Sequence, residues 1–143
     1  AVSVFMMRAG RVLMQQRAME KYHTPGLWTN TCCTHPDWEE APQDCAVRRL
    51  KEELGISGLS PVHRHHLEYR ADVGGGLTEH EVVDVYVANA GPDMPLAPNP
   101  DEVMAVRWVS LADLVRDVEQ NADRYTPWLR IYLRDHADTI FGE

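Results

Sequence analysis

The stretch Thr29-Asn30-Thr31-Cys32-Cys33-Thr34-His35-Pro36 combines β-forming residues with a thiol and an imidazole at alternate positions. If this stretch is extended, successive side chains point to opposite faces of a sheet. Cys33 and His35 then share one face, whereas Cys32 and Thr34 share the other. The sequence therefore predicts a thiol and an imidazole side by side on one face of a strand.

A second short motif, Glu79-His80-Glu81, begins an apolar strand. Alternation places both glutamates on one face, which the strand continues with Val83, Val85 and Val87. Two carboxylates beside a buried face are costly unless something compensates them. His35 and the two carboxylates suit a divalent cation, and a thiol beside such a site is a candidate acid or base. The alternative is an exposed pair of glutamates, which the apolar residues after them disfavour.

Strand and helix signals alternate around these motifs without a repeat or a linker. The predicted strands cover residues 1–7, 11–17, 28–35, 61–73, 78–90 and 103–109. The predicted helices cover residues 42–54, 111–119 and 126–140. Turn signals at Ala9-Gly10 and at Gly74-Gly75-Gly76 join neighbouring strands as hairpins, and Ser110 caps the second helix. Mixed strands with a few helices indicate one α+β domain.

The helix predicted over Pro42–Leu54 separates its acidic residues. Its apolar stripe consists of Ala46, Val47, Leu50 and Leu54. At 3.6 residues per turn, Arg49 and Glu53 fall beside this stripe, whereas Arg48 and Glu52 fall on the opposite face. Glu53 and Arg49 can therefore line a site next to the core. The alternative is a solvated helix whose charges form i,i+4 pairs.

Composition excludes several classes of protein. The 143 residues, 25% charged and 44% hydrophobic, suit one globular domain. No apolar run approaches the roughly 20 residues of a membrane helix, and a net charge of −8 disfavours nucleic-acid binding. Three cysteines, two of them adjacent, form no disulfide framework and indicate a reducing cytoplasm. We expect a cytoplasmic protein with no membrane, nucleic-acid or obligate protein partner.

The predicted helix and the segment before it keep most of the spacing of the Nudix box, G-x5-E-x7-R-E-U-x-E-E-x-G. The matching residues are Thr34, Glu40, Arg48, Glu52, Glu53 and Gly55. Two positions depart from the box, because Thr34 stands at its first glycine and Arg49 stands at the glutamate of its R-E pair. The same departures occur in type I isopentenyl-diphosphate isomerases, a family with the Nudix fold.

The chain resembles this family along almost its whole length. The matching runs are Pro25-Gly26-Leu27-Trp28-Thr29-Asn30, Cys33-Thr34-His35-Pro36, Arg48-Arg49-Leu50-Lys51-Glu52-Glu53-Leu54-Gly55, Glu68-Tyr69-Arg70-Ala71, Glu79-His80-Glu81-Val82 and Asp101-Glu102-Val103-Met104. The resemblance implies a single Nudix-like domain over residues 1–143, with mixed sheets packed by helices. It also implies an enzyme of isoprenoid biosynthesis that converts isopentenyl diphosphate into dimethylallyl diphosphate.

The resemblance implies roles for the residues of both motifs. Cys33 matches the family's catalytic cysteine and Glu81 its catalytic glutamate, which add a proton to one face of the alkene and remove one from the other. Tyr69 matches a tyrosine at the acid site, where sharing a proton would tune the Glu81 carboxylate. The residues that match ligands of a tightly bound Mn²⁺, Mg²⁺ or Zn²⁺ are His35, Glu79 and Glu81.

The resemblance also implies how the substrate is bound. Arg17, Lys21 and Arg49 match positions that hold the diphosphate. Glu53 matches a residue associated with a second metal ion, Mg²⁺, which bridges to the diphosphate. Trp128 matches a tryptophan at the hydrocarbon end, where an indole face stabilises a carbocation by about 0.5–2 kcal/mol. Because water would trap that carbocation, the site must be dry.

In this family, further histidine metal ligands come from a segment just before the first strand. The chain begins at that strand with Ala1, so we expect those ligands to be absent from the 143 residues and metal binding to be reduced. His23 is a weaker candidate for a replacement ligand, because its loop matches substrate-binding positions.

Two other functions are compatible with a Nudix fold. A hydrolase of nucleoside diphosphate derivatives is disfavoured because Arg49 replaces a carboxylate that such enzymes use in metal-assisted attack by water. An inactive module that only binds a phosphorylated ligand or a partner protein is disfavoured by the presence of Cys33 together with Glu81. Taken alone, Cys33 is more typical of a small buried hydrophobe than of a catalyst, and Cys32 and Cys45 keep the interpretation as small buried hydrophobes.

Overall fold

The computed structural model describes residues 1–21 and 24–142 of the chain. Its strands are β1 (Val2–Arg8), β2 (Arg11–Arg17), β3 (Trp28–Thr29), β4 (Cys32–Thr34), β5 (Val62–Gly74), β6 (Leu77–Asn89) and β7 (Val103–Ser110). Its helices are α1 (Pro42–Leu54), α2 (Leu111–Gln120), α3 (Pro127–Asp135) and α4 (Ala137–Phe141), with a 3₁₀ helix η1 (Ala122–Arg124). Within the described ranges, no helix is both long and apolar enough to cross a membrane.

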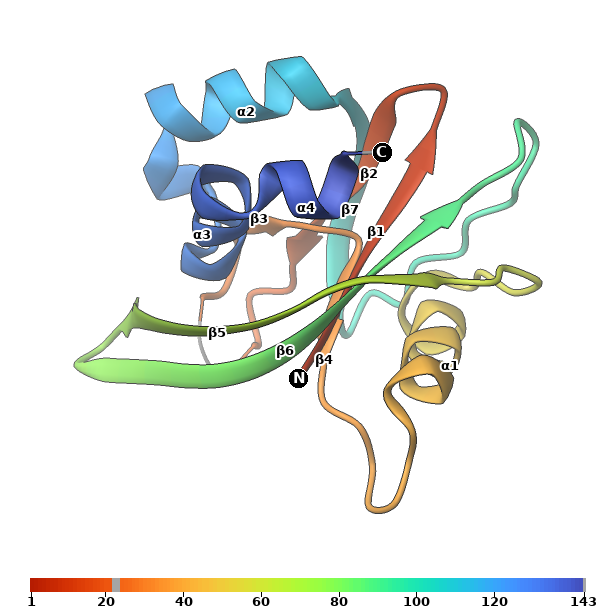
Figure 1. Ribbon diagram of the computed structural model, residues 1–143, viewed down its shortest axis with the longest axis horizontal. Helices are drawn as coiled ribbons and strands as arrows, with labels where there is room; N and C mark the ends of the chain where they lie inside the picture. The colour runs from red at the N-terminus through yellow and green to blue at the C-terminus, as the bar shows by residue number, and fades with distance from the viewer. Residues whose placement is uncertain (22–23, 143) are drawn as a thin grey trace.

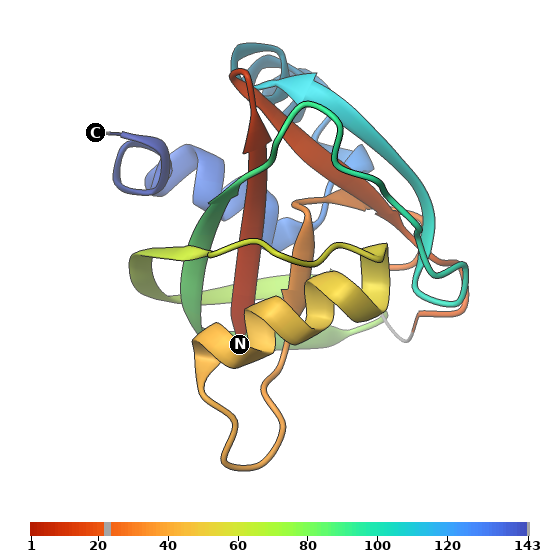
Figure 2. The same ribbon diagram turned by 90° about the vertical axis from the view of Figure 1, so that its right-hand side faces the viewer.

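One mixed sheet forms the centre of the fold. Its strand order is β3-β2-β1-β6-β5, with β4 paired to β1 and β7 paired to β2. The hairpins β1–β2 and β5–β6 are antiparallel, as predicted, whereas β1 and β6 are parallel. Helix α1 lies on one side of β1, and α2, α3 and α4 lie on the other (Figures 1 and 2). The predicted α+β fold, a mixed sheet packed by helices, is confirmed.

Strand β1 separates two hydrophobic clusters by simple alternation. Val2 and Val4 belong to the cluster that contains the buried residues of α1, whereas Phe5 belongs to the cluster of α2, α3 and α4. Ser3 is fully buried on the Phe5 side of the strand. Strand β1 therefore has two buried faces, and the Ser3 hydroxyl lies on the face that packs against α2, α3 and α4.

The predicted first and last residues of α1 are confirmed. Pro42 lies in the first turn, and Gly55 ends the helix with a φ of 67°, a left-handed conformation that glycine adopts without strain. The prediction that Val47 joins the apolar stripe is wrong, because Val47 is 41% exposed. Cys45 is buried instead, because the buried face of α1 is rotated toward the side of the helix that carries Glu53.

The single strand expected over residues 28–35 consists of the two short strands β3 and β4. The residues between them, Asn30 and Thr31, are fully buried. The Asn30 amide donates to the Val4 carbonyl at 3.1 Å, and the Thr31 hydroxyl donates to the Leu13 carbonyl at 2.6 Å. These side-chain bonds take the place of a regular ladder and interrupt the strand.

The prediction of a single helix over residues 126–140 is wrong. Helices α3 and α4 meet at His136, whose φ of −131° lies outside the helical range. The Nδ1 atom of His136 lies 3.0 Å from Nε2 of His65 on β5, so its side chain contacts the sheet at the break.

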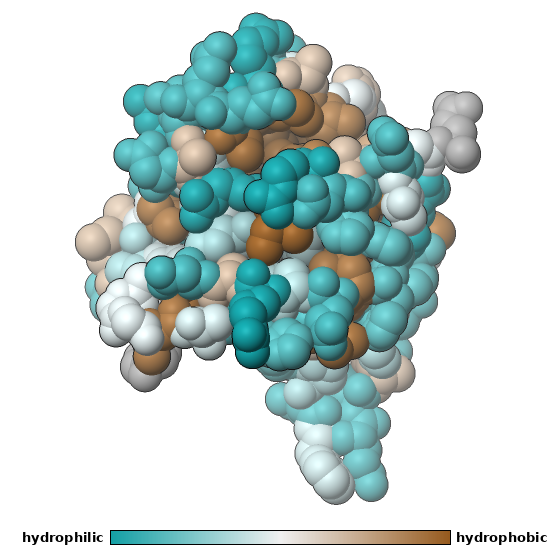
Figure 3. Space-filling model, turned by 60° about the vertical axis from the view of Figure 1, so that its left-hand side comes forward, coloured by the Kyte–Doolittle hydropathy of each residue, from teal (hydrophilic) through white to brown (hydrophobic). Residues whose placement is uncertain are grey.

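Trp38 lies outside the hydrophobic core. It is 92% exposed in the loop between β4 and α1. This loop projects from the body of the molecule in Figure 1 and carries a mostly hydrophilic surface in Figure 3. A residue type that is usually buried therefore stands in solvent.

Candidate active site

Residues from six parts of the fold meet in a cleft of about 410 Å³. They come from the end of β2 and the loop after it, from β4, α1 and β6, from the turn before β7, and from α3. The lining residues are Arg17, Glu20, Lys21, Cys33, Thr34, His35, Arg49, Glu79, Asp101, Glu102 and Trp128. The cleft therefore contains most of the residues that the sequence predicts for a site, including the thiol and the imidazole on one strand face.

Cys33 lies on β4 with its side chain half-buried in the wall of the cleft. The Ser3 hydroxyl is 3.4 Å from its sulfur and also 2.9 Å from the Tyr132 hydroxyl, which lies on α3. Burial raises the pKa of the Cys33 thiol to about 11, against the smaller opposing effects of Ser3 and Arg17. The thiol is therefore protonated at neutral pH and can act as a proton carrier.

Glu79 on β6 lines the cleft and is bonded to Tyr69, which is buried on β5. The Tyr69 hydroxyl donates to Oε1 of Glu79 at 2.5 Å, and burial raises the pKa of Tyr69, so the phenol keeps its proton. The expected pairing of Tyr69 with the Glu81 carboxylate is wrong. Glu81 lies directly opposite Tyr69 in the β5–β6 register, but its carboxylate turns toward His35.

The candidate metal ligands lie in three separate environments. His35 Nε2 and Glu81 Oε1 are 2.9 Å apart, so these two donors can reach one cation. Glu79 lies on the same strand face but is held by Tyr69, and Glu53 lies on α1. In the described part of the chain, no three or more histidine, cysteine, aspartate or glutamate side chains are grouped so that they could hold a metal ion. His23 lies outside the described residues.

Glu53 is buried on α1 beside Cys32, on the opposite side of β4 from Cys33. The Cys32 thiol donates to Oε2 of Glu53 at 2.9 Å, and Gln15 Nε2 lies 3.5 Å from Oε1. Burial raises the pKa of Glu53, although the bond from Cys32 and the charge of Arg49 oppose that shift. The interpretation of Cys32 as a small buried residue is therefore confirmed, and the structure adds that its thiol donates a hydrogen bond to a carboxylate.

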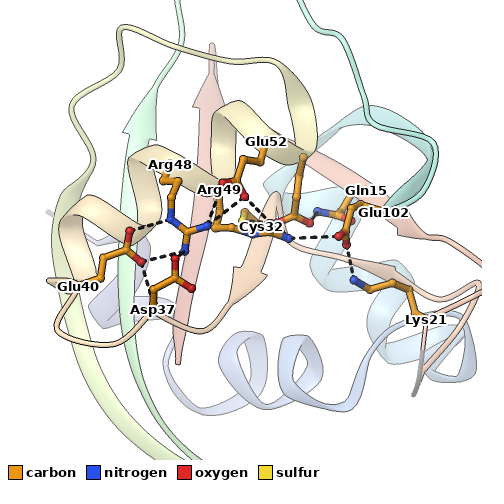
Figure 4. A network of polar contacts seen from close by, with 10 residues as sticks. Gln15, Lys21, Cys32, Asp37, Glu40, Arg48, Arg49, Glu52 and Glu102 are labelled. Atoms are coloured by element: carbon orange, nitrogen blue, oxygen red, sulfur yellow. Dashed lines mark hydrogen bonds and ion pairs between the residues drawn. The ribbon is translucent and has the colours of Figure 1, made fainter.

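Three cations face the cleft from different elements. Arg17 is largely buried at the end of β2, and its guanidinium lies 5.3 Å from the centre of the Trp128 ring. Lys21, in the loop after β2, forms an ion pair with Glu102. Arg49 extends from α1 and contacts Glu102 at 3.5 Å (Figure 4). The structure thus brings together all three residues predicted to hold the diphosphate.

Trp128 closes the cleft from α3 and is 2% exposed. Its indole nitrogen donates to the Thr29 hydroxyl at 3.0 Å, which fixes the ring. Tyr132 lies one helical turn further along α3, with its ring centre 6.1 Å from those of Phe5 and Tyr69. Aromatic rings therefore lie on the thiol side of the site, whereas most of the other residues that line the cleft are charged.

Sequence reasoning missed three residues of this site. Ser3 could have been found as a polar residue in the apolar run of β1 that pairs with Cys33 in the β1–β4 register. Tyr132 could have been found four residues after Trp128, on the same helix face. Glu102 belongs to a run that was compared with the family, but no signal in the sequence pairs it with Lys21.

The Nudix character of the fold is supported by two kinds of comparison. The sequence matches the NUDIX domain family over residues 1–129. The structure resembles the crystal structure of DR0079 from Deinococcus radiodurans, with a TM-score of 0.76 at 17% identity over 93% of this chain and 79% of that one. It also resembles a MutT NUDIX hydrolase from Burkholderia pseudomallei, with a TM-score of 0.69 at 26% identity over 94% and 95% of the two chains. The fold and the match define a Nudix-domain protein.

Sequence relatives narrow this class. The chain is 74% identical to the isopentenyl-diphosphate Delta-isomerase of Roseobacter denitrificans, over 100% of this chain and 81% of the relative. It is 63% identical to the isopentenyl-diphosphate Delta-isomerase of Dinoroseobacter shibae, over 99% of this chain and 81% of that protein. The chain therefore belongs to the isopentenyl-diphosphate Delta-isomerase family within the Nudix fold.

Proposed function

We propose that this protein catalyses the isomerisation of isopentenyl diphosphate to dimethylallyl diphosphate, a step of isoprenoid biosynthesis. The observation that carries the proposal is the cleft that the Cys33 thiol shares with the Glu79 carboxylate and with three cations. A thiol and a carboxylate suit proton transfer, and the cations suit a diphosphate. The relatives match this chain over its whole length at high identity, and their names support the same reaction.

The proposed reaction moves a double bond by two proton transfers. A proton adds to the terminal alkene carbon and produces a tertiary carbocation at the branched carbon. Loss of a proton from the carbon on the other side then forms the new double bond, so no atom is gained or lost overall. We assign these transfers to Cys33 and Glu81, with Tyr69 and Glu79 as a hydrogen-bonded pair beside them.

The surroundings of Cys33 suit a carbocation. Trp128 lines the same cleft as Cys33, and Tyr132, whose ring packs against that of Tyr69, contacts the same Ser3 hydroxyl as the thiol. A cation over an aromatic face gains about 0.5–2 kcal/mol, more where both are desolvated. We assign Trp128 to the hydrocarbon end of the substrate on this ground.

The diphosphate is assigned to Arg17, Lys21 and Arg49. The Nε atom of Arg49 is buried and makes no hydrogen bond within the described residues, which leaves a donor for an anionic ligand. The diphosphate is not cleaved, so it supplies binding energy that positions the alkene between the proton carriers.

Nudix enzymes in general use divalent metal ions. We propose that Glu53 helps to hold an Mg²⁺ that neutralises diphosphate charge, and that His35, Glu79 and Glu81 hold a second Mn²⁺, Mg²⁺ or Zn²⁺. The adjacent donors of His35 and Glu81 support the second assignment. All three cysteines are free, which favours the reducing cytoplasm as the place of action on a small diphosphate substrate.

The test is isomerisation in deuterated water. The protein is incubated with isopentenyl diphosphate, Mg²⁺ and Mn²⁺, and the product is followed by NMR. Dimethylallyl diphosphate carrying solvent deuterium supports the proposal. Phosphate release from nucleoside diphosphate derivatives without isomerisation would identify a hydrolase instead, and neither activity with metal present would identify a binding module.

A further inference from the structure

We propose that Glu102 is an internal carboxylate that competes with the substrate's diphosphate for Lys21 and Arg49, and thereby sets the affinity of the cleft for diphosphate. This inference rests on the proposed function, because it takes Lys21 and Arg49 as part of the diphosphate site. Glu102 acts through these two cations, so it is a positioning residue for them.

Glu102 bridges the two cations with separate oxygens. Oε2 pairs with the Lys21 ammonium, and Oε1 lies 3.5 Å from Nη2 of Arg49. Figure 4 shows Glu102 between the loop that carries Lys21 and the helix that carries Arg49. An anion that takes the same donors, the Lys21 ammonium and Nη2 of Arg49, must therefore displace the Glu102 carboxylate from them.

The backbone fixes Glu102 at this position. Its carbonyl accepts a hydrogen bond from Ala18 N at 3.1 Å, and its own N–H donates to the Asn99 carbonyl at 3.0 Å. Asn99 N in turn donates to the Glu53 carbonyl at the end of α1 at 2.8 Å. The carboxylate is therefore tethered beside both cations, and its return after a ligand leaves costs little conformational entropy.

Glu102 is charged when it makes these contacts. Its side chain is only 25% exposed, and burial by itself would raise its pKa, but the bond from Lys21 and the charge of Arg49 hold the pKa below the ordinary value. The lining of the cleft contains three arginine or lysine side chains against four carboxylates. A diphosphate thus meets a cleft whose own acids already balance its cations.

Competition of this kind suits an isomerase. The substrate and the product carry the same diphosphate, so the head group binds both equally and does not favour the transition state. A carboxylate that takes back Lys21 and Arg49 weakens both complexes and shortens the lifetime of the product complex. Glu102 thereby limits binding that would otherwise slow product release.

The experiment compares Glu102→Gln with Glu20→Gln. Both variants remove one negative charge from the same cleft, but Glu20 is exposed and makes no ion pair within the described residues. The Kd of inorganic pyrophosphate is measured by calorimetry at fixed Mg²⁺, and KM and kcat are measured for isopentenyl diphosphate. We expect Glu102→Gln to lower both Kd and KM about fivefold without raising kcat, the size of one partly exposed charge pair. Glu20→Gln removes a charge from the cleft without releasing a cation from an ion pair, so it is expected to lower Kd and KM by a clearly smaller factor than Glu102→Gln does.

Several results would overturn the inference. These are unchanged or weaker pyrophosphate binding by Glu102→Gln, or equal tightening by Glu20→Gln, which would reflect net charge alone. Damage to the fold cannot mimic the expected result, because it would weaken binding. If Glu102→Gln does not fold, Glu102→Asp replaces it, since the shorter side chain withdraws the carboxylate and should tighten binding to a smaller degree. A wild-type protein that neither binds pyrophosphate nor isomerises the substrate would instead refute the proposed function.

Discussion

Cys32 and Cys33 are neighbours in the chain but belong to different parts of the molecule. Cys32 is fully buried on the α1 side of β4, where its thiol donates to Glu53. Cys33 faces the cleft on the other side of the strand, beside Ser3, whose hydroxyl also contacts Tyr132. Strand alternation alone produces this separation. The position of a thiol relative to the sheet, and not its residue type, therefore decides whether it can reach a substrate.

Both thiols are held in the protonated form by burial, but only one can exchange its proton with a ligand. The pKa of Cys32 is raised by burial and then by the neighbouring Glu53 carboxylate. The pKa of Cys33 is raised by burial to about 11, and Arg17 opposes this shift. The comparison predicts that alanine at Cys33 lowers turnover and leaves the fold intact, whereas alanine at Cys32 lowers stability and leaves turnover nearly unchanged.

The largest effect is expected for Cys33→Ala, which removes a proton carrier from the cleft. Turnover should fall by at least about 10³-fold, within the range of a lost acid–base group. The fold should remain intact, because the change removes only a half-buried sulfur. Deuterium incorporation by NMR measures turnover, and thermal unfolding measures the fold. Full activity in the variant would remove Cys33 from the mechanism.

Glu81→Gln is expected to be nearly as severe. The amide keeps the shape of the side chain but can neither accept a full proton nor bind a cation as a carboxylate does, so turnover should fall almost as far as in Cys33→Ala. Circular dichroism and unfolding curves should match those of the wild-type protein. Metal content measured after purification provides a second readout, and its reduction would support the pairing of Glu81 with His35 as donors to one cation.

Tyr69→Phe tests the hydrogen bond from the Tyr69 hydroxyl to Glu79, which the sequence did not predict. Removing the hydroxyl leaves Glu79 without the 2.5 Å bond that orients it. We expect kcat to fall about 10- to 100-fold, less than a lost proton carrier costs, with little change in KM. A change in KM alone would show that Tyr69 serves binding and not the proton transfers.

Much of the fold and the site follows from short-range patterns in the sequence. The limits of α1, the β5–β6 hairpin and the common face of Cys33 and His35 follow from turn chemistry and alternation. Such patterns do not predict which of two neighbouring carboxylates forms a given hydrogen bond. The pairing of Tyr69 with Glu79 depends on the packing of side chains across a sheet, which periodicity does not specify.

The exceptions have specific physical causes. The strand over 28–35 is broken because the side chains of Asn30 and Thr31 take over backbone hydrogen bonds. The hydrogen bond of the buried Cys32 thiol is not predicted by the sequence, because its partner is Glu53, 21 residues away on α1. Both cases involve buried polar side chains that bond to distant parts of the chain, and a single sequence carries no signal for such partners.

The reactivity of the two thiols should differ with pH. Alkylation by iodoacetamide follows the thiolate form, so labelling of Cys33 should keep rising between pH 9 and 11 and should not level off near pH 9. Cys32 should stay unlabelled in the native protein over the same range, because it is fully buried. Peptide mapping by mass spectrometry distinguishes the two, and the unfolded protein provides the control in which both react.

The smallest effect on turnover is expected for Cys32→Ala. Activity should be nearly unchanged, since Cys32 does not face the cleft, but the Glu53 carboxylate loses a buried donor. The free energy of unfolding should therefore fall by about 1–3 kcal/mol. Cys32→Ser is the matched control, because its hydroxyl can still donate to Glu53 and should restore part of the loss. A fall in turnover as large as that of Cys33→Ala would assign the proton transfer to the wrong side of β4.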